Sequence, residues 1–190
     1  SYTGDLGFEI YIDRMHQRGL FDLLWAAGQR HGMQPFGMRA MMSLRLDKFF
    51  GSWMNEYSPD YTAGETGLDR FIDFNKPVDF IGRAAAEKER SAGPARCLVA
   101  FEVDAEDADV TAYEPVWIDG EVRGFCTSGG YSHYAQKSVA LALIPRGVSK
   151  PGLVVEIEIL GSRRPARLIE TPLFDPDGAR MRQDLTAVCS

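Results

Sequence analysis

The chain has 190 residues, 45% of them hydrophobic, so it can bury one substantial core or two smaller ones and is expected to be globular. Its formal net charge of −6 excludes a protein that holds nucleic acid by its phosphates, because such binding needs clustered lysines and arginines. The three cysteines, Cys97, Cys126 and Cys189, show no metal-ligand spacing, which favours a reduced cytosolic or organelle-matrix protein.

The sequence shows no targeting or membrane-spanning segment. No apolar run approaches the roughly 18 residues that cross a bilayer, and no charged-then-apolar leader precedes the first motif. The chain opens at Ser1 in what reads as the middle of a folded unit, so we expect a fragment of a longer protein. Its expected location is the cytoplasm, or the mitochondrial matrix in a eukaryote.

The first predicted element is a β-strand at Gly7–Ile12, where apolar and polar side chains alternate. Phe8 and its apolar i+2 and i+4 neighbours share a core-facing side. Glu9 and Tyr11 share the other side, which we expect to meet something polar. The pattern alone favours a solvated Glu9 carboxylate over one that binds a ligand.

Two helices are predicted next. The first spans His16–His31, with leucines at helical spacing and Gly32 as its stop, and is expected to lie on a sheet. The second spans about Gly37–Phe49. Its methionines are expected to fill a core, because flexible thioether side chains commonly do so.

The segment Ser52–Gly67 has no clean period and predicts an ordered loop whose aromatic side chains must be held by something outside it. A short strand is predicted at Asp69–Phe74 and a helix at Ile81–Arg90. Arg90–Pro94 is the predicted domain boundary, because its Gly-Pro pair interrupts regular secondary structure and the hydrophobic periodicity differs on its two sides.

Everything after the boundary predicts short strands separated by turns, typical of a small antiparallel barrel or sandwich. The turn signals include Asp119-Gly120 and Gly161-Ser162, and Gly129-Gly130 is also interpreted as a tight turn rather than a phosphate nest. The predicted strands are Cys97–Val103, Glu114–Ile118, Glu121–Ser128, Ser138–Ile144, Leu153–Leu160 and Arg164–Ile169.

Common catalytic signatures are absent from the sequence: it has no HExxH, GxSxG, P-loop or GxGxxG string. The histidines lie far apart without metal-ligand spacing, so no metal site is predicted. His133, flanked by Tyr131 and Tyr134, is the best histidine candidate for chemistry.

Five short segments occur in order: SYTGDLGFE at 1–9, SLRLDK at 43–48, DFIGR at 79–83, CTSGGYS at 126–132 and TPLFDP at 171–176. Together they resemble the motifs of the glycine cleavage T-protein (aminomethyltransferase) family, with Asp5 where SYTGExGxE usually has Glu. The resemblance covers almost the whole chain. It implies an α+β fold: a partial α/β ferredoxin-like layer, part of the folate-binding domain, over residues 1–92, then a small antiparallel β-barrel domain over 93–190.

The resemblance also implies a tetrahydrofolate site, with Tyr2 lining it and Glu9 hydrogen-bonding the pterin. A pterin edge presents adjacent N–H donors, and one carboxylate can accept two of them. Tyr11 and Arg39 are further candidate folate contacts. In this family the aspartate that matters for one-carbon transfer lies in the N-terminal half, upstream of Ser1, so Asp5 is not its replacement.

Departures from the T-protein pattern indicate a subfamily. T-proteins carry ARDSLRLE, whose arginine belongs to the folate site, whereas Met41 stands in that place here and Arg39 lies two positions away. The run from Phe74 to Gly82 is more similar to dimethylglycine and sarcosine dehydrogenases. That resemblance implies an FAD unit upstream, and folate and a methylamine such as dimethylglycine or sarcosine as partners.

Other readings remain open within the resemblance. A free-standing glycine cleavage aminomethyltransferase would need a lipoyl carrier protein as partner. A non-catalytic folate-binding protein on the same fold would carry KGCYxGQE, which this sequence lacks. A demethylase of sulfonium compounds shares the fold as well. No reading predicts a nucleic-acid or membrane partner.

Overall fold

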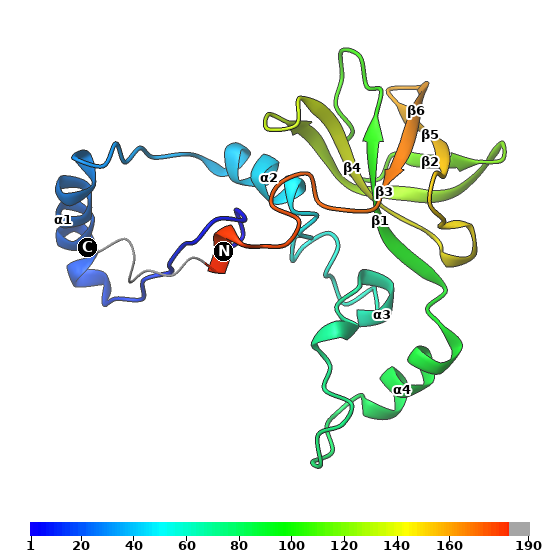
Figure 1. Cartoon of the computed structure of the whole chain (residues 1–190), viewed down its shortest axis with the longest axis horizontal. Helices are drawn as coiled ribbons and strands as arrows, with labels where there is room; N and C mark the ends of the chain where they lie inside the picture. Colours follow the sequence, from blue (N-terminus) through cyan, green and yellow to red (C-terminus); the bar gives the residue numbers. More distant parts are fainter. Residues whose placement is uncertain (183–190) are drawn as a thin grey trace.

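The computed structural model describes residues 1–182 as a β-barrel with a helical N-terminal stretch that extends away from it (Figure 1). Helix α2 lies between the two parts. The elements in chain order are η1 (Arg14–His16), α1 (Gln17–Gln29), α2 (Met38–Asp47), α3 (Ala63–Thr66), η2 (Asp69–Phe71), α4 (Arg83–Ala92), β1 (Arg96–Val103), β2 (Pro115–Ile118), β3 (Glu121–Ser132), β4 (Lys137–Pro145), η3 (Arg146–Val148), β5 (Val154–Ile159), β6 (Ser162–Ile169) and η4 (Arg180–Arg182).

The strands close into a barrel in the order β1-β4-β3-β2-β5-β6, with antiparallel neighbours throughout. The barrel and its predicted strands are therefore confirmed, within a few residues at each end. Two hairpins turn on two residues with positive φ, Asp119-Gly120 and Leu160-Gly161, as type I′ turns require. Closure pairs every strand of the barrel with two neighbours.

The prediction of a tight turn at Gly129-Gly130 is wrong, because both glycines lie inside β3. Gly129 is needed there for close approach, because a Cβ on it would collide with the carbonyl oxygen of Val110. A Cβ on Gly130 would only make an ordinary van der Waals contact with Leu46 of α2. Gly129 therefore lets a loop pack directly on the strand.

The main hydrophobic core fills the barrel, where alternate side chains of the strands point inward. Its fully buried members include Phe101, Val116 and Ile157. A second, smaller cluster joins Leu46 at the end of α2 to Ala100 and Leu141 on the barrel wall. The last turn of α2 is thus fixed to the barrel by apolar burial.

The predicted helices are confirmed as α1, α2 and α4, but the strand predicted at Gly7–Ile12 is wrong. That segment has no regular secondary structure, and no strand within residues 1–182 pairs with it. Alternating apolar and polar residues can give a strand two different sides, but a strand also needs a hydrogen-bonded neighbour. Phe8 is 73% exposed, and α1 buries no side chain, so α1 does not lie on a sheet. Residues 1–92 contain no strand, and the implied ferredoxin-like sheet is not formed among them.

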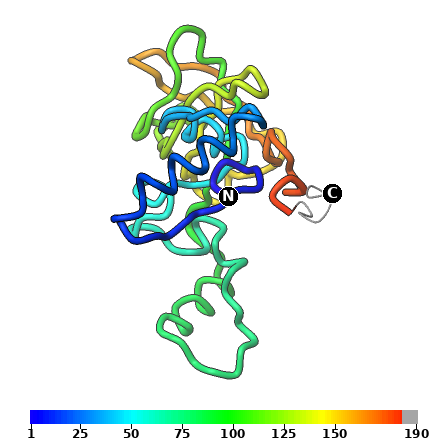
Figure 2. The backbone as a smooth tube through the Cα atoms, turned by 90° about the vertical axis from the view of Figure 1, so that its left-hand side faces the viewer, coloured from blue at the N-terminus to red at the C-terminus, as the bar shows by residue number. Residues whose placement is uncertain are grey.

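The strand predicted at Asp69–Phe74 is also wrong, since the 3₁₀ helix η2 begins at Asp69. The preceding α3 closes a capping box between Thr62 and Glu65. The Glu65 carboxylate also accepts hydrogen bonds from Arg96 of β1 at 2.8 and 3.2 Å. These bonds attach residues 63–92, which we call the α3–α4 arm, to the barrel. This arm projects from the rest of the molecule in Figure 2. Among the described residues, no helix is both long and apolar enough to cross a bilayer.

Candidate functional site

A cavity of about 700 Å³ opens between the N-terminal turn, α2 and the loop that follows it. We call it the methionine pocket. Its walls are almost wholly apolar. The lining residues are Tyr2, Met38, Met41, Met42, Gly51, Ser52, Trp53, Met54, Asn55 and Tyr57.

Helix α2 supplies one wall. Met38, Met41 and Met42 follow one another at i, i+3 and i+4, so they share one helix face. They are exposed or half-buried, and the prediction that they fill a core is wrong. Unbranched, polarizable thioethers of this kind adapt to the shape of a bound ring.

Tyr2 of the N-terminal turn also lines the pocket. Its hydroxyl donates to the carbonyl oxygen of Gly51 at 3.2 Å. Burial raises the pKa of Tyr2, although the nearby Arg45 guanidinium acts in the opposite direction. The phenol is therefore neutral at physiological pH and serves as a hydrogen-bond donor.

The loop at residues 50–57 supplies the outer wall. The amide of Gly51 donates to the Tyr57 hydroxyl at 3.0 Å. A Cβ on Gly51 would lie only 2.6 Å from the Cβ of Glu56 and 2.7 Å from the Tyr57 ring. Only glycine fits at this point of the loop, and the tight fold leaves Trp53 and Met54 projecting, 83% and 85% exposed.

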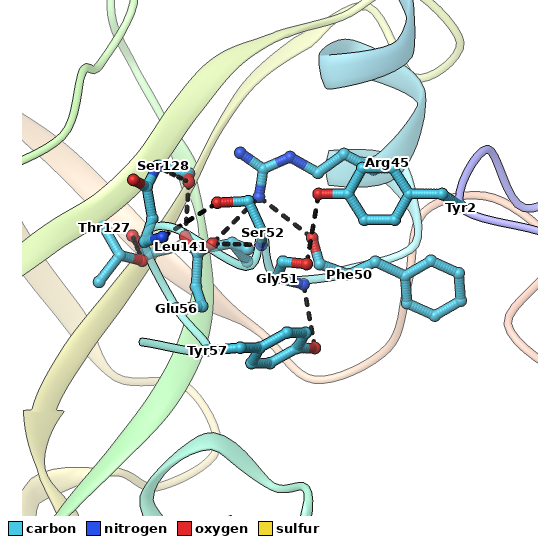
Figure 3. A network of polar contacts seen from close by, with 11 residues as sticks. Tyr2, Arg45, Phe50, Gly51, Ser52, Glu56, Tyr57, Thr127, Ser128 and Leu141 are labelled. Atoms are coloured by element: carbon cyan, nitrogen blue, oxygen red, sulfur yellow. Dashed lines mark hydrogen bonds and ion pairs between the residues drawn. The ribbon is translucent and has the colours of Figure 1, made fainter. Parts of the chain in front are cut away.

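Beneath the loop lies a buried polar network, drawn in Figure 3. The Glu56 carboxylate is completely buried and lies 3.4 Å from Nη1 of Arg45, which is 1% exposed. It also accepts bonds from the Ser52 amide at 2.6 Å and the Ser128 hydroxyl at 2.5 Å. The network thus connects α2, the loop and β3.

Of the four folate contacts predicted from the sequence, the structure brings Tyr2 into the methionine pocket. Glu9 and Tyr11 lie together outside it, where the Tyr11 hydroxyl donates to the Glu9 carboxylate at 2.7 Å. That hydrogen bond raises the pKa of Tyr11. Both side chains face solvent, and so does Arg39 on α2. Tyr11 borders a smaller hollow of about 440 Å³ against α1.

Other candidate groups are used structurally. Asp5 pairs with Arg180 at 2.5 Å. His133 packs edge-on against Tyr131, with ring centroids 5.1 Å apart. Nowhere in residues 1–182 do three His, Cys, Asp or Glu side chains gather into a possible metal site. Burial raises the pKa of the Cys126 thiol to about 12, so it is not a nucleophile.

The sequence does not predict which residues form the pocket walls, although it singles out the aromatic residues after α2. It predicts that these residues need a partner outside their loop. Tyr61 has one in Phe125 of β3, with ring centroids 6.4 Å apart. Tyr57 instead bonds Gly51 within the loop, and Trp53 is largely exposed. Met41, which stands in place of a folate-site arginine in the T-protein pattern, lines the same pocket. A cavity of this size with methionine and aromatic walls suits a flat, largely apolar ring system.

Two family models match the chain. The description "GCVT N-terminal domain" matches residues 1–76, and "Glycine cleavage T-protein C-terminal barrel domain" matches residues 96–175. The matches fall on either side of the segment between α4 and β1.

Known proteins resemble nearly the whole chain. It is 41% identical over 186 residues to dimethylglycine dehydrogenase, mitochondrial, of Mus musculus, covering 97% of this chain and 21% of that protein. It is 36% identical over 174 residues to an aminomethyltransferase of Symbiobacterium thermophilum, covering 92% of this chain and 46% of that protein. The chain thus spans about a fifth to a half of these relatives' length.

A solved structure has the same fold. The crystal structure of glycine cleavage system aminomethyltransferase T from Bartonella henselae superposes with a TM-score of 0.84 at 25% identity. The match covers 93% of this chain and 48% of that one.

Proposed function

Because this chain belongs to the glycine cleavage T-protein family, we propose that it is a tetrahydrofolate-dependent one-carbon transfer module. We propose further that the parent protein is a flavoenzyme of the dimethylglycine or sarcosine dehydrogenase type. The 41% identity to dimethylglycine dehydrogenase, against 36% to the aminomethyltransferase, supports this choice. So does Met41, which stands where the T-protein pattern has an arginine.

One observation carries the proposal: Tyr2, from the motif that suggests folate binding, lines a methionine pocket large enough for a pterin ring. The apolar walls fit the ring faces and exclude water from them. Ser52 and Asn55, which are among the lining residues, carry the polar side chains that we propose meet the ring edge.

Tetrahydrofolate would supply the nitrogen atoms that take up the one-carbon unit. This chain's part is to hold and orient the ring. Tyr2, Met41 and Trp53 would contact its faces. Glu9 remains a proposed acceptor for the amino-pyrimidine edge, although its carboxylate faces solvent in this structure. The acid that serves the transfer step is proposed to lie outside this chain.

The proposed domain division keeps the boundary at residues 92 and 93. The ranges of the two family matches, 1–76 and 96–175, support it. Gly93 supports it as well, because it ends α4 with a φ of +79° before β1 opens the barrel. Residues 1–92 would form part of the folate-binding domain and residues 93–190 the barrel domain.

Two alternatives are kept. As a glycine cleavage aminomethyltransferase, the protein would take its aminomethyl group from a lipoyl carrier protein. The 36% identity to an aminomethyltransferase is the observation behind this second candidate. As a non-catalytic folate-binding protein it would bind the cofactor and transfer nothing.

Binding is tested first, by titrating tetrahydrofolate under anaerobic conditions into the polypeptide as its gene encodes it. We expect saturable heat in a calorimeter, and weaker binding by Trp53→Ala. Trp25→Ala, which removes a tryptophan of α1 outside the methionine pocket, should bind as the wild type does. No saturable binding by the wild-type protein at millimolar tetrahydrofolate would overturn the proposal.

Activity separates the candidates. A dehydrogenase-type parent should contain bound flavin and form methylenetetrahydrofolate from dimethylglycine or sarcosine and tetrahydrofolate. An aminomethyltransferase should do so only with the aminomethylated lipoyl carrier protein. A protein that binds tetrahydrofolate but forms no methylenetetrahydrofolate from either kind of donor would favour the hypothesis of a non-catalytic folate-binding protein.

A further inference from the structure

We propose that Glu56 is a positioning residue: its buried carboxylate holds the loop at residues 50–57 in the shape that forms the methionine pocket, and links the pocket to the barrel. The inference rests on the proposed folate function for the identity of the ligand. It goes beyond that function because the Glu56 side chain points to the buried side of the loop and does not line the pocket.

The loop makes a few hydrogen bonds within itself, from the amides of Asn55 and Tyr57 to the Ser52 carbonyl oxygen, but no regular element supports it. It contains neither helix nor strand, and its Trp53 and Met54 side chains are largely exposed. Such a segment would sample many shapes unless buried contacts fixed it. A pocket wall made of this loop therefore needs an anchor beneath it.

Glu56 has the geometry of that anchor (Figure 3). One carboxylate oxygen, Oε2, accepts from the Ser52 amide at 2.6 Å and lies 3.4 Å from Nη1 of Arg45. The same Arg45 nitrogen donates to the Phe50 carbonyl oxygen at 3.1 Å. The ion pair thus fixes the start of the loop at two backbone positions and ties both to α2.

The other carboxylate oxygen reaches the barrel. Oε1 accepts the Ser128 hydroxyl at 2.5 Å, and Ser128 in turn accepts from Nδ2 of Asn55 at 3.3 Å. Ser128 belongs to β3, 72 residues from Glu56 in the sequence. Since Asn55 lines the methionine pocket, a displacement of the loop at the pocket is transmitted to a barrel strand through two hydrogen bonds.

The charge of Glu56 is essential to this arrangement. A completely buried carboxylate persists only when donors surround it, and these three donors come from three separate elements. Replacing it with glutamine keeps the volume, but weakens the ion pair and places an amide N–H₂ against donors. Arg45 would then lack its buried counter-charge, and the loop would be released.

The test measures loop order and ligand affinity separately in the full protein. Hydrogen–deuterium exchange followed by mass spectrometry reports on peptides covering residues 50–57, and calorimetry reports tetrahydrofolate affinity. For Glu56→Gln we expect exchange in these peptides to accelerate, and affinity to fall, by about tenfold or more each. Ser128→Ala should change both in the same direction by less, and it serves if Glu56→Gln does not fold.

The matched control is Glu65→Gln, which breaks another buried carboxylate–arginine pair, to Arg96, away from the pocket. It should lower the melting temperature without changing exchange at residues 50–57 or tetrahydrofolate affinity. A merely structural role for Glu56 would make the two glutamine variants behave alike, and would overturn the inference.

The remaining outcomes are distinct. Unchanged exchange at residues 50–57 in both Glu56→Gln and Ser128→Ala overturns the inference, whatever the protein binds. Faster exchange with unaltered affinity overturns the positioning role. If the wild-type protein binds no tetrahydrofolate, the proposed function fails, while faster exchange in the two variants still supports Glu56 as the anchor of the loop.

Discussion

The hydroxyl of Tyr2 donates a hydrogen bond to the carbonyl oxygen of Gly51, a residue 49 positions away in the sequence, at 3.2 Å. This contact joins the first turn of the chain to the loop after α2, and it closes one side of the methionine pocket.

Tyr2→Phe should keep the aromatic wall and lose the bond. We expect the free energy of unfolding to fall by about 1 kcal/mol, the usual net worth of one such hydrogen bond. Urea denaturation followed by circular dichroism measures it. Tyr11→Phe is the control, because its hydroxyl meets only the exposed Glu9 and its loss should leave stability unchanged.

Glu9→Gln tests the proposed pterin contact. If Glu9 accepts from the pterin edge in the complex, replacing a charged acceptor with a neutral one should cost roughly 1 to 3 kcal/mol of tetrahydrofolate binding. Calorimetry measures the loss. Glu121→Gln, on an exposed barrel hairpin, is the control, and equal affinities for all three proteins would remove Glu9 from the site.

The Glu65–Arg96 pair should make stability depend on pH in the acid range. The hydrogen bond from Arg96 lowers the pKa of Glu65 below its ordinary 4.5. A carboxyl whose pKa is lower in the folded state stabilises the protein above the unfolded pKa, and this stabilisation disappears as pH falls through the folded value.

Glu65→Gln should therefore be less stable than the wild type at pH 7 by about 1 kcal/mol, a modest figure because the Arg96 side chain is 38% exposed. The difference should shrink as the pH is lowered below about 4.5. Thermal melts at a series of pH values measure it. A difference that stays constant between pH 7 and pH 3 would contradict the assignment.

Gly129→Ala should destabilise the barrel by about 1 to 3 kcal/mol, because the new methyl group meets the backbone of Val110, which cannot move without opening the loop. Gly147→Ala is the matched control, since nothing lies within 4 Å of its Cβ position. Melting temperatures of the two variants should separate clearly, and a silent Gly129→Ala would mean that the loop is not seated on β3.

Cys126 should resist alkylation in the folded protein. With a thiol pKa of about 12, only about one molecule in 10,000 carries the reactive thiolate at pH 8. Iodoacetamide treatment followed by peptide mass spectrometry should leave Cys126 unmodified until denaturant is added. Rapid labelling of Cys126 without denaturant would show that the barrel opens readily.

The sequence predicted the barrel well because each strand carries its own local signal. Alternating side chains face the core, and Asp119-Gly120 supplies the turn that two strands require. Gly129-Gly130 could not be interpreted in this way. Gly129 is required because Val110 packs against it, and only the tertiary structure brings Val110 close, so the pattern resembled a turn.

The N-terminal segment was predicted less well, because local patterns do not show which strands pair. Alternation at Gly7–Ile12 identified a shared side for Glu9 and Tyr11, and the two do meet. It did not determine whether a partner strand lies beside them. For the methionine pocket, a sequence motif pointed to Tyr2, whereas Trp53 and Met41 join Tyr2 in its lining only in the folded chain. The buried Glu56 likewise meets Ser128 of β3 only through the tertiary structure.

The segment Gly7–Ile12 has a consequence for handling the chain at high concentration. No strand among residues 1–182 pairs with its backbone N–H and C=O groups, and Phe8 and Ile10 are more than half exposed. Extended apolar segments of this kind seed edge-to-edge association and precipitation, which the closed barrel avoids. A solubilising charge at Ile10 is consequently the first change to make when the isolated chain is purified.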